Sequence, residues 1–151
     1  MITSLHHSSF TVSNVEKSIA FYRDVLGMEV VWDSSQVGRV FKGPHTDAIT
    51  ECPSSEQRIV FMALGDCFLE LVQFTPTGKP LVGNKAGDTG SGHACFLTDN
   101  MEELKQKLLA YGARLHCEPQ RMANGGWILY FRDPDGIILE AIEGKPPVDS
   151  R

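Results

Sequence analysis

The sequence has none of the features that mark membrane, secreted or nucleic-acid-binding proteins. No apolar run approaches the roughly 20 residues that a membrane span needs, and residues 1–4 have neither the basic nor the apolar region of a signal peptide. Acidic residues outnumber basic ones by 19 to 14, so no basic surface for nucleic acid is expected. The four cysteines form no C-x-x-C motif, which is typical of reduced thiols. We therefore expect a cytoplasmic protein that binds neither membrane nor nucleic acid.

The composition is that of a globular chain, and its clearest local signal is a hairpin over residues 127–143. Of the 151 residues, 42% are hydrophobic and 22% charged, enough for one domain or two small halves. The motif R-D-P-D-G at 132–136 is strong turn chemistry between two apolar, β-rich runs. The second run places Glu140 among apolar neighbours. Since an unpaired buried carboxylate is costly, Glu140 either faces solvent or has a partner.

Two helices are predicted from apolar stripes at helical spacing. Residues 15–26 follow Ser13 and Glu16, a capping box, and end at Gly27. Residues 101–111 follow Asp99 and Glu102, a second capping box, and end at Gly112. Strands are expected over residues 5–12, 28–32, 58–64, 67–74, 93–98 and 113–117, besides the hairpin. Residues 33–57 form an irregular excursion in which 37–41 and 46–50 are candidate short strands, and the glycine-rich stretch 75–92 is a linker or mobile loop.

These elements occur twice in the same order. Aligning His7 with His93 (93 − 7 = 86) also aligns Asn14 with Asn100, and aligning Glu70 with Glu140 (140 − 70 = 70) aligns the final strands. The sequence therefore predicts one domain, 1–151, built of two strand–helix–strand–strand–strand modules. Module one covers about 1–75, a linker about 76–91, module two about 92–145, and a C-terminal tail 146–151.

The repeat singles out a histidine on the first strand and a glutamate on the last strand of each half. A lone histidine or glutamate on a strand is usually structural or solvated, but four at repeated positions require a repeated coincidence. Two imidazoles and two carboxylates suit one divalent ion, such as Zn²⁺, Ni²⁺, Co²⁺, Fe²⁺ or Mn²⁺. The predicted ligands are His7, Glu70, His93 and Glu140. By contrast, we expect His6 to face the other side of its strand in a structural role, and His45 and His116 to be surface or loop residues.

Several stretches together resemble the vicinal oxygen chelate superfamily, the group of glyoxalase I, methylmalonyl-CoA epimerase, extradiol dioxygenases and the fosfomycin and bleomycin resistance proteins. They are the F-Y-R-D-V-L-G stretch at 21–27, L-E-L-V-Q-F at 69–74, G-H-A-C-F-L-T-D-N at 92–100 and F-R-D-P-D-G-I-I-L-E at 131–140. The resemblance implies an α+β fold, in which two paired βαβββ modules form a cupped, partly open, β-barrel-like sheet around a metal, with helices outside. The family's four ligand positions fall on His7, Glu70, His93 and Glu140.

A His/Glu/His/Glu set is similar to that of bacterial glyoxalase I. The resemblance implies a lyase or isomerase that binds two adjacent substrate oxygens and moves a proton through an enediolate, with Glu70 or Glu140 as both ligand and base. Glyoxalase I typically has an Asn-Trp-Gly stretch near its glutathione site, after the second ligand. No such stretch follows Glu70 here, which argues against a glutathione site. Members of the family often form homodimers, and we expect one here.

Two alternatives stay open at this point. One is a metal-free small-molecule binding or antibiotic-resistance protein with an aromatic cup that includes Trp32, Phe68, Phe74 and Trp127. The other is an extradiol-type dioxygenase, which fits less well because such enzymes use three protein ligands.

Overall fold

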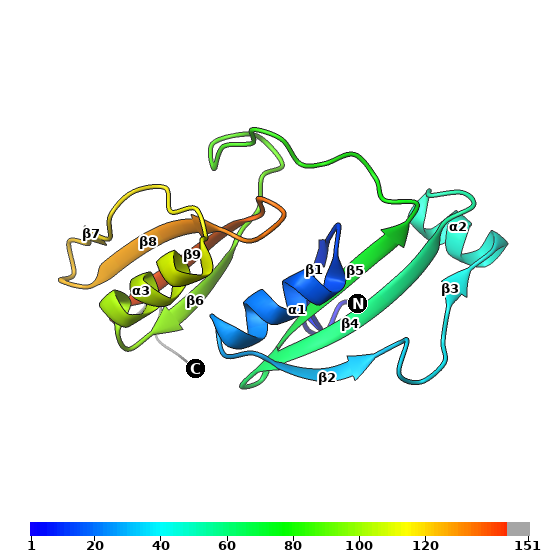
Figure 1. Cartoon of the computed structure of the whole chain (residues 1–151), viewed down its shortest axis with the longest axis horizontal. Coiled ribbons are helices and arrows are strands. Elements are labelled where there is room, and N and C mark those ends of the chain that lie inside the picture. Colours follow the sequence, from blue (N-terminus) through cyan, green and yellow to red (C-terminus); the bar gives the residue numbers. More distant parts are fainter. Residues whose placement is uncertain (145–151) are drawn as a thin grey trace. The chain divides into compact units, whose positions relative to one another are not determined.

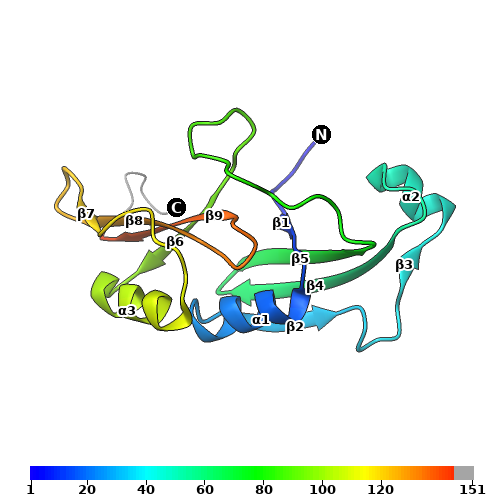
Figure 2. The same cartoon turned by 45° about the horizontal axis from the view of Figure 1, so that its top comes forward.

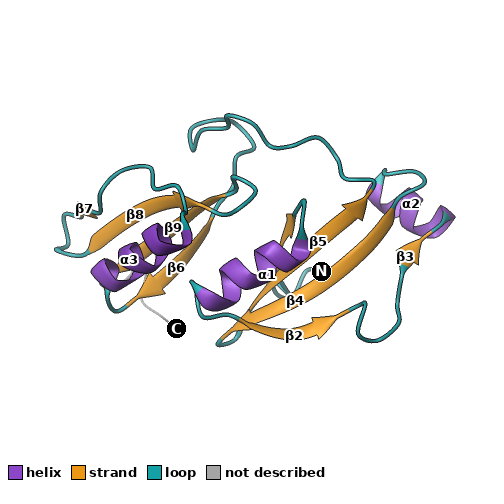
Figure 3. Ribbon diagram, viewed as in Figure 1, coloured by secondary structure: helices purple, strands orange, loops and turns teal. Residues whose placement is uncertain are grey.

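The structure, a computed structural model, describes residues 1–144, and the predicted tail 146–151 lies outside them. The chain divides into two compact units, Met1–Pro80 and Leu81–Arg151, each with its own sheet and long helix (Figures 1 and 3). The first unit contains β1 (Ser8–Thr11), α1 (Val15–Asp24), β2 (Glu29–Asp33), β3 (Phe41–Lys42), α2 (Pro44–Thr50), β4 (Glu56–Leu64) and β5 (Cys67–Thr75). The second contains β6 (Ala94–Thr98), α3 (Met101–Tyr111), β7 (Gln120–Arg121), β8 (Trp127–Arg132) and β9 (Ile138–Glu143).

Each sheet starts with a parallel pair, which is what a strand–helix crossover produces. The first sheet runs β1-β5-β4-β2, with β3 also paired to β4, and the second runs β6-β9-β8-β7. Within the described part of the chain, neither sheet closes into a barrel. The fold is therefore α+β with two βαβββ sheets, as predicted. Among the described residues, no helix has both the length and the apolar character that a membrane crossing requires.

In each unit the long helix lies along one face of the sheet (Figure 2). On β5, Leu69 and Leu71 are buried, whereas Glu70 between them points to the other face. The helices supply the other half of the core through apolar residues at helical spacing. In the first unit these are Val15, Ile19, Phe21 and Tyr22, and in the second Met101 and Leu108.

Both helices begin with an asparagine, one residue later than the predicted capping boxes. The side chain of Asn14 accepts a hydrogen bond from Lys17 N (3.0 Å), and that of Asn100 accepts one from Glu103 N (3.0 Å). The predicted caps Ser13 and Asp99 were therefore wrong by one position. Both asparagines have extended backbone conformations, which direct the side-chain oxygen at the exposed N–H groups of the first turn.

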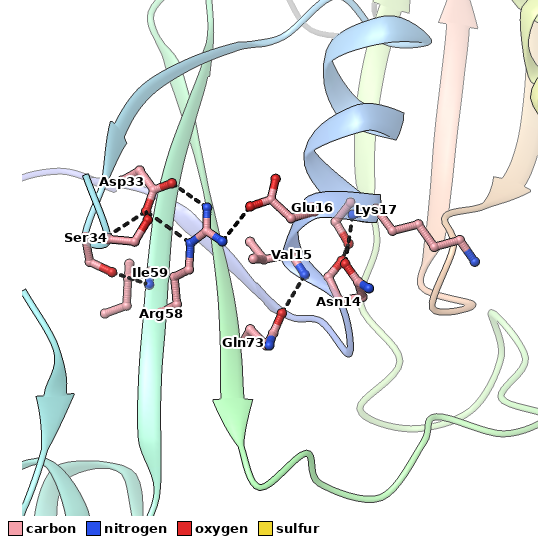
Figure 4. Close-up of polar contacts among 11 residues, drawn as sticks. Asn14, Val15, Glu16, Lys17, Asp33, Ser34, Arg58, Ile59 and Gln73 are labelled. Carbon is pink, nitrogen blue, oxygen red and sulfur yellow. Dashed lines mark hydrogen bonds and ion pairs between the residues drawn. The ribbon is translucent and has the colours of Figure 1, made fainter.

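A side chain on the last strand of each unit binds the first helical N–H group. Val15 N donates to Gln73 Oε1 (2.7 Å, Figure 4), and Met101 N donates to Glu143 Oε2 (2.6 Å). The two acceptors are 70 positions apart, which is also the offset between Glu70 and Glu140. The repeat thus extends to the contacts that fix each helix against its sheet.

The predicted excursion 33–57 contains more regular structure than expected. Residues 44–50 form the helix α2, so a strand at 46–50 was wrong, and only Phe41–Lys42 of the region near 37–41 pairs as β3. Pro44 explains the helix, because proline fits the first helical position, where no N–H is needed.

The predicted strand 113–117 was also wrong. Leu115 forms a single bridge to Phe131, and pairing with β8 resumes only at Gln120. Between these paired positions, four residues of the edge (116–119) oppose two of β8 (129–130), which is an irregularity of the bulge type. Pro119 lies in the bulge and has no N–H to donate to a ladder.

The predicted hairpin is present, and its turn also contacts the glycine-rich segment. Asp133 Oδ1 accepts hydrogen bonds from Asp135 N (2.9 Å) and Ile137 N (2.8 Å), and Gly136 has a φ of 86°. Arg132 at the same turn donates to the side chain and the backbone carbonyl of Asn84 (2.8 and 2.5 Å). The segment before β6 is therefore attached to the turn of the hairpin.

Candidate metal centre

The first histidine–glutamate pair lies on the polar face of the first sheet. His7 directly precedes β1, and Glu70 is in the middle of β5, the strand that pairs with β1. His7 Nε2 is 3.5 Å from Glu70 Oε2, and the two side chains are 32% and 16% exposed. The imidazole and the carboxylate thus face one another at a partly open position.

The second pair repeats this arrangement at closer range. His93 directly precedes β6, and Glu140 is in the middle of β9. His93 Nε2 is 2.8 Å from Glu140 Oε2, and the side chains are 33% and 9% exposed. The partner predicted for a carboxylate on an apolar strand is therefore His93.

Each glutamate occupies the centre of a three-residue row across its sheet. Ser9 on β1 and Phe61 on β4 are the cross-strand neighbours of Glu70. Cys95 on β6 and Tyr130 on β8 are the neighbours of Glu140. Directly opposite residues project from the same face of a sheet. Each row therefore lies on the face on which its glutamate meets the histidine. Sequence reasoning missed Tyr130, Cys95 and Phe61 because strand pairing registers are not visible in the sequence.

The row in the second unit surrounds Glu140 with weakly acidic groups. Burial and the nearby charge of Glu140 raise the pKa of the Cys95 thiol to about 11. Burial, followed by the charge of Glu140, also raises the pKa of Tyr130. Both groups are therefore protonated at neutral pH and can donate hydrogen bonds.

The remaining histidines lie outside the two pairs. The prediction that His6 faces the side opposite His7 was wrong. Both residues precede β1, so the alternation of side chains along a strand does not apply to them. His6 Nδ1 is 2.7 Å from His7 Nδ1, and the His6 ring stacks on Phe68. His45 lies on α2, and His116 is exposed with its ring stacked on Tyr130.

The donor chemistry of the pairs fits a divalent metal ion. Each pair brings one imidazole nitrogen and one carboxylate oxygen within 3.5 Å of each other, and these are the ligand types that Zn²⁺, Ni²⁺, Co²⁺, Fe²⁺ and Mn²⁺ accept. Within residues 1–144, the His, Cys, Asp and Glu side chains form no group of three or more that could hold a metal ion. Each unit thus presents two donors.

Comparisons with known proteins agree with this fold. The sequence profile of the Glyoxalase/Bleomycin resistance protein/Dioxygenase superfamily matches residues 4–141. A mitochondrial methylmalonyl-CoA epimerase from Mus musculus is 28% identical over 146 residues, covering 90% of this chain and 70% of that protein. A lactoylglutathione lyase from Salmonella typhimurium is 28% identical over 146 residues, covering 93% of each.

A solved structure shares the architecture at lower sequence identity. The crystal structure of a glyoxalase family protein from Bacillus cereus has a TM-score of 0.78 at 19% identity, covering 95% of both chains. At this identity the likeness concerns the fold alone.

Proposed function

Because the chain belongs to the Glyoxalase/Bleomycin resistance protein/Dioxygenase superfamily, we propose that it is a divalent-metal-dependent lyase or isomerase of the glyoxalase I or epimerase type. Its substrate would be a small molecule with two adjacent oxygens and an acidic C–H bond beside a carbonyl. His7, Glu70, His93 and Glu140 would bind one metal ion, and one of the two glutamates would also act as the base. We also propose a homodimer located in the cytoplasm.

The observation that carries the proposal is the repeated histidine–glutamate contact. In each unit a histidine just before the first strand meets a glutamate in the middle of the last strand, at 3.5 Å and 2.8 Å. Packing of the core does not call for this contact twice, since each glutamate projects from the face opposite its buried strand neighbours, such as Leu69 and Leu71 beside Glu70. Relatives that are a lyase and an epimerase by name support the same class of reaction.

The metal would polarise the two substrate oxygens as a Lewis acid and so favour loss of the neighbouring proton. The chain itself would supply the group that takes that proton. A carboxylate serves as such a base when its oxygen comes within about 2.6–3.2 Å of the proton's carbon or an intervening water. Glu70 and Glu140 are the two carboxylates of the pairs, and either is a candidate for this role.

The two glutamates differ in how firmly they are held. Glu70 is the more exposed, and its contact with histidine is the longer. Glu140 is nearly buried and lies between Cys95 and Tyr130 on the neighbouring strands. Comparing Glu70→Gln with Glu140→Gln therefore identifies the base, provided that metal content and the rate of substrate turnover are measured on the same samples.

The first test is elemental analysis of gently purified protein. We expect about one divalent metal per chain, and loss of that metal in both His7→Ala and Glu140→Ala. His45→Ala is the matched control, because it removes an imidazole outside the two pairs and should keep the metal. A metal-binding protein would then be screened with thiol adducts of 2-oxoaldehydes, acyl-CoA epimers and catechols. Absence of metal, with none taken up on titration, would overturn the proposal and favour a metal-free binding protein.

A further inference from the structure

Each histidine–glutamate pair lies beside an aromatic ring on the strand next to its glutamate, which is β4 in the first sheet and β8 in the second. Phe61 is directly opposite Glu70, and its ring centroid is 5.2 Å from that of His7. Tyr130 is directly opposite Glu140, and its ring centroid is 5.2 Å from that of His93. The ring therefore has the same place and spacing in both units.

The two rings differ by one hydroxyl group, and that group contacts the second pair. Tyr130 Oη is 3.3 Å from His93 Nε2, the same nitrogen that lies 2.8 Å from Glu140 Oε2. Tyr130 is also directly opposite Glu140, so its ring projects from the face of the sheet that carries the carboxylate. The first pair has only a phenyl ring at this place, so packing against the histidine does not require a hydroxyl.

Counting protons assigns the direction of these bonds. A neutral imidazole has at most one proton on Nε2, and at 2.8 Å that proton is donated to Glu140. The phenol is protonated at neutral pH, since its ordinary pKa is about 10, so its O–H is free to donate to the carboxylate. Glu140 thus accepts from His93, and the Tyr130 hydroxyl beside them has a proton to donate within the pair.

The two bonds respond differently to a metal on His93. An imidazole nitrogen that binds a metal uses its lone pair and carries no proton, so Nε2 can no longer donate to Glu140. The Tyr130 hydroxyl keeps its proton and its place on β8. It is therefore a donor that can orient Glu140 with or without the ion.

We propose that the Tyr130 hydroxyl is a positioning group that holds Glu140 and His93 in the orientation needed for metal binding. The proposal rests on the proposed function, in which these two residues are ligands. It makes the two units unequal, because among residues 1–144 the hydroxyl of Tyr130 on β8 contacts the second pair, whereas β4 presents a phenyl ring to the first. Outer partners of this kind typically change metal affinity about 10- to 100-fold when removed.

The test compares Zn²⁺ affinity, measured by competition with a chromophoric chelator, in the wild type and Tyr130→Phe. The substitution keeps the ring and removes only the hydroxyl, which recreates the situation at Phe61. We expect binding to weaken by about 10-fold or more, with an unchanged circular dichroism spectrum and melting temperature. Tyr111→Phe on α3 is the matched control and should bind as the wild type does. Wild-type affinity in Tyr130→Phe would overturn the inference while leaving the proposed function intact.

A metal-free measurement separates this inference from the proposed function. The ring ¹⁵N chemical shifts of the histidines, recorded without metal at one pH, report hydrogen bonding at each nitrogen. Tyr130→Phe should shift the Nε2 signal of His93 and leave that of His7 in place. If the wild type binds no metal, the proposed function fails, and this shift alone decides whether Tyr130 holds the pair. Unchanged His93 signals would overturn the inference.

Discussion

Among single residues, Asp33 carries the most deeply buried charge outside the histidine–glutamate pairs. Its carboxylate is 2.6 Å from Arg58 Nη2 and also accepts hydrogen bonds from Arg58 Nε and Ser35 (Figure 4). Arg58 also reaches Glu16 on α1 at 2.6 Å, so the guanidinium links the helix to β2 and β4. The hydrogen bonds from Arg58 are the main cause that holds the pKa of Asp33 below its usual range.

Replacing Asp33 by Asn should lower the free energy of unfolding at neutral pH by about 2 kcal/mol, the value of hydrogen bonds to a charged group. Because the folded-state pKa of Asp33 is depressed, its stabilisation is complete above the unfolded pKa of about 3.9 and is lost as pH falls through the folded pKa. The variant should therefore lose less stability than the wild type on acidification below about pH 4. Urea unfolding between pH 7 and pH 3 measures both effects.

Glu16→Gln is the control for this prediction. Its side chain is 70% exposed, so the pair with Arg58 is screened by solvent and should contribute about 0.5 kcal/mol or less. An equal loss in the two variants would show that Asp33 is not the dominant partner of Arg58.

Single residues also show where the sequence was informative and where it was not. Glu140 was recognisable because a carboxylate on an apolar strand needs a partner, and its repeat-related position led to His93. Tyr130 and Cys95 gave no such signal, since tyrosine is an ordinary strand former and a lone cysteine is usually a small apolar residue. Their place beside Glu140 depends on the registers of β8 and β6 with β9, which loop lengths decide.

At the level of whole elements, the second sheet is closely packed where β8 meets β9. Gly126, just before β8, leaves no room for a side chain: a Cβ there would overlap the carbonyl oxygen of Glu143 and lie 2.8 Å from Met122 Cε. Met122 is flexible, but the Glu143 carbonyl belongs to β9 and cannot move without disturbing the sheet. Gly126→Ala should therefore lower the free energy of unfolding by about 1–3 kcal/mol, the usual cost of overpacking.

Gly87→Ala tests the same substitution where nothing lies within 4 Å of the new Cβ. It should be neutral or stabilise by up to about 1 kcal/mol, because alanine restricts the unfolded chain. Thermal unfolding of the two variants under identical conditions separates them. Equal melting temperatures would mean that β8 and β9 adjust to the extra methyl group without cost.

The elements differ in how far the sequence predicted them. The helices α1 and α3 were visible from apolar stripes that end in glycine, although their caps are the asparagines that the repeat itself had aligned. The helix α2 was missed because threonine and isoleucine at 46–50 favour strands, and Pro44 at its first position was the contrary signal. The predicted edge strand 113–117 of the second sheet was too long. Its pairing with β8 is interrupted by the irregular stretch that contains Pro119.

For the molecule as a whole, the internal repeat explains both the fold and the candidate site. Two offsets, 86 and 70, aligned the elements of two βαβββ sheets and also their histidines and glutamates. The repeat carries no information on the residues inserted between the aligned strands, and these are the segments that we expect to select the substrate. The fold class was therefore predictable from the sequence, whereas the substrate was not.

If each unit supplies two of four ligands, metal binding should stabilise the whole chain and require both units. At a free Zn²⁺ concentration of 100 times Kd, the free energy of unfolding of the wild type should rise by about 2.7 kcal/mol. Glu70→Gln and Glu140→Gln remove one ligand from the first and the second unit, respectively, and each should abolish most of this gain. Urea unfolding with Zn²⁺ and with EDTA measures the difference for all three proteins. Full stabilisation retained in either variant would show that a single histidine–glutamate pair binds the ion without the other unit.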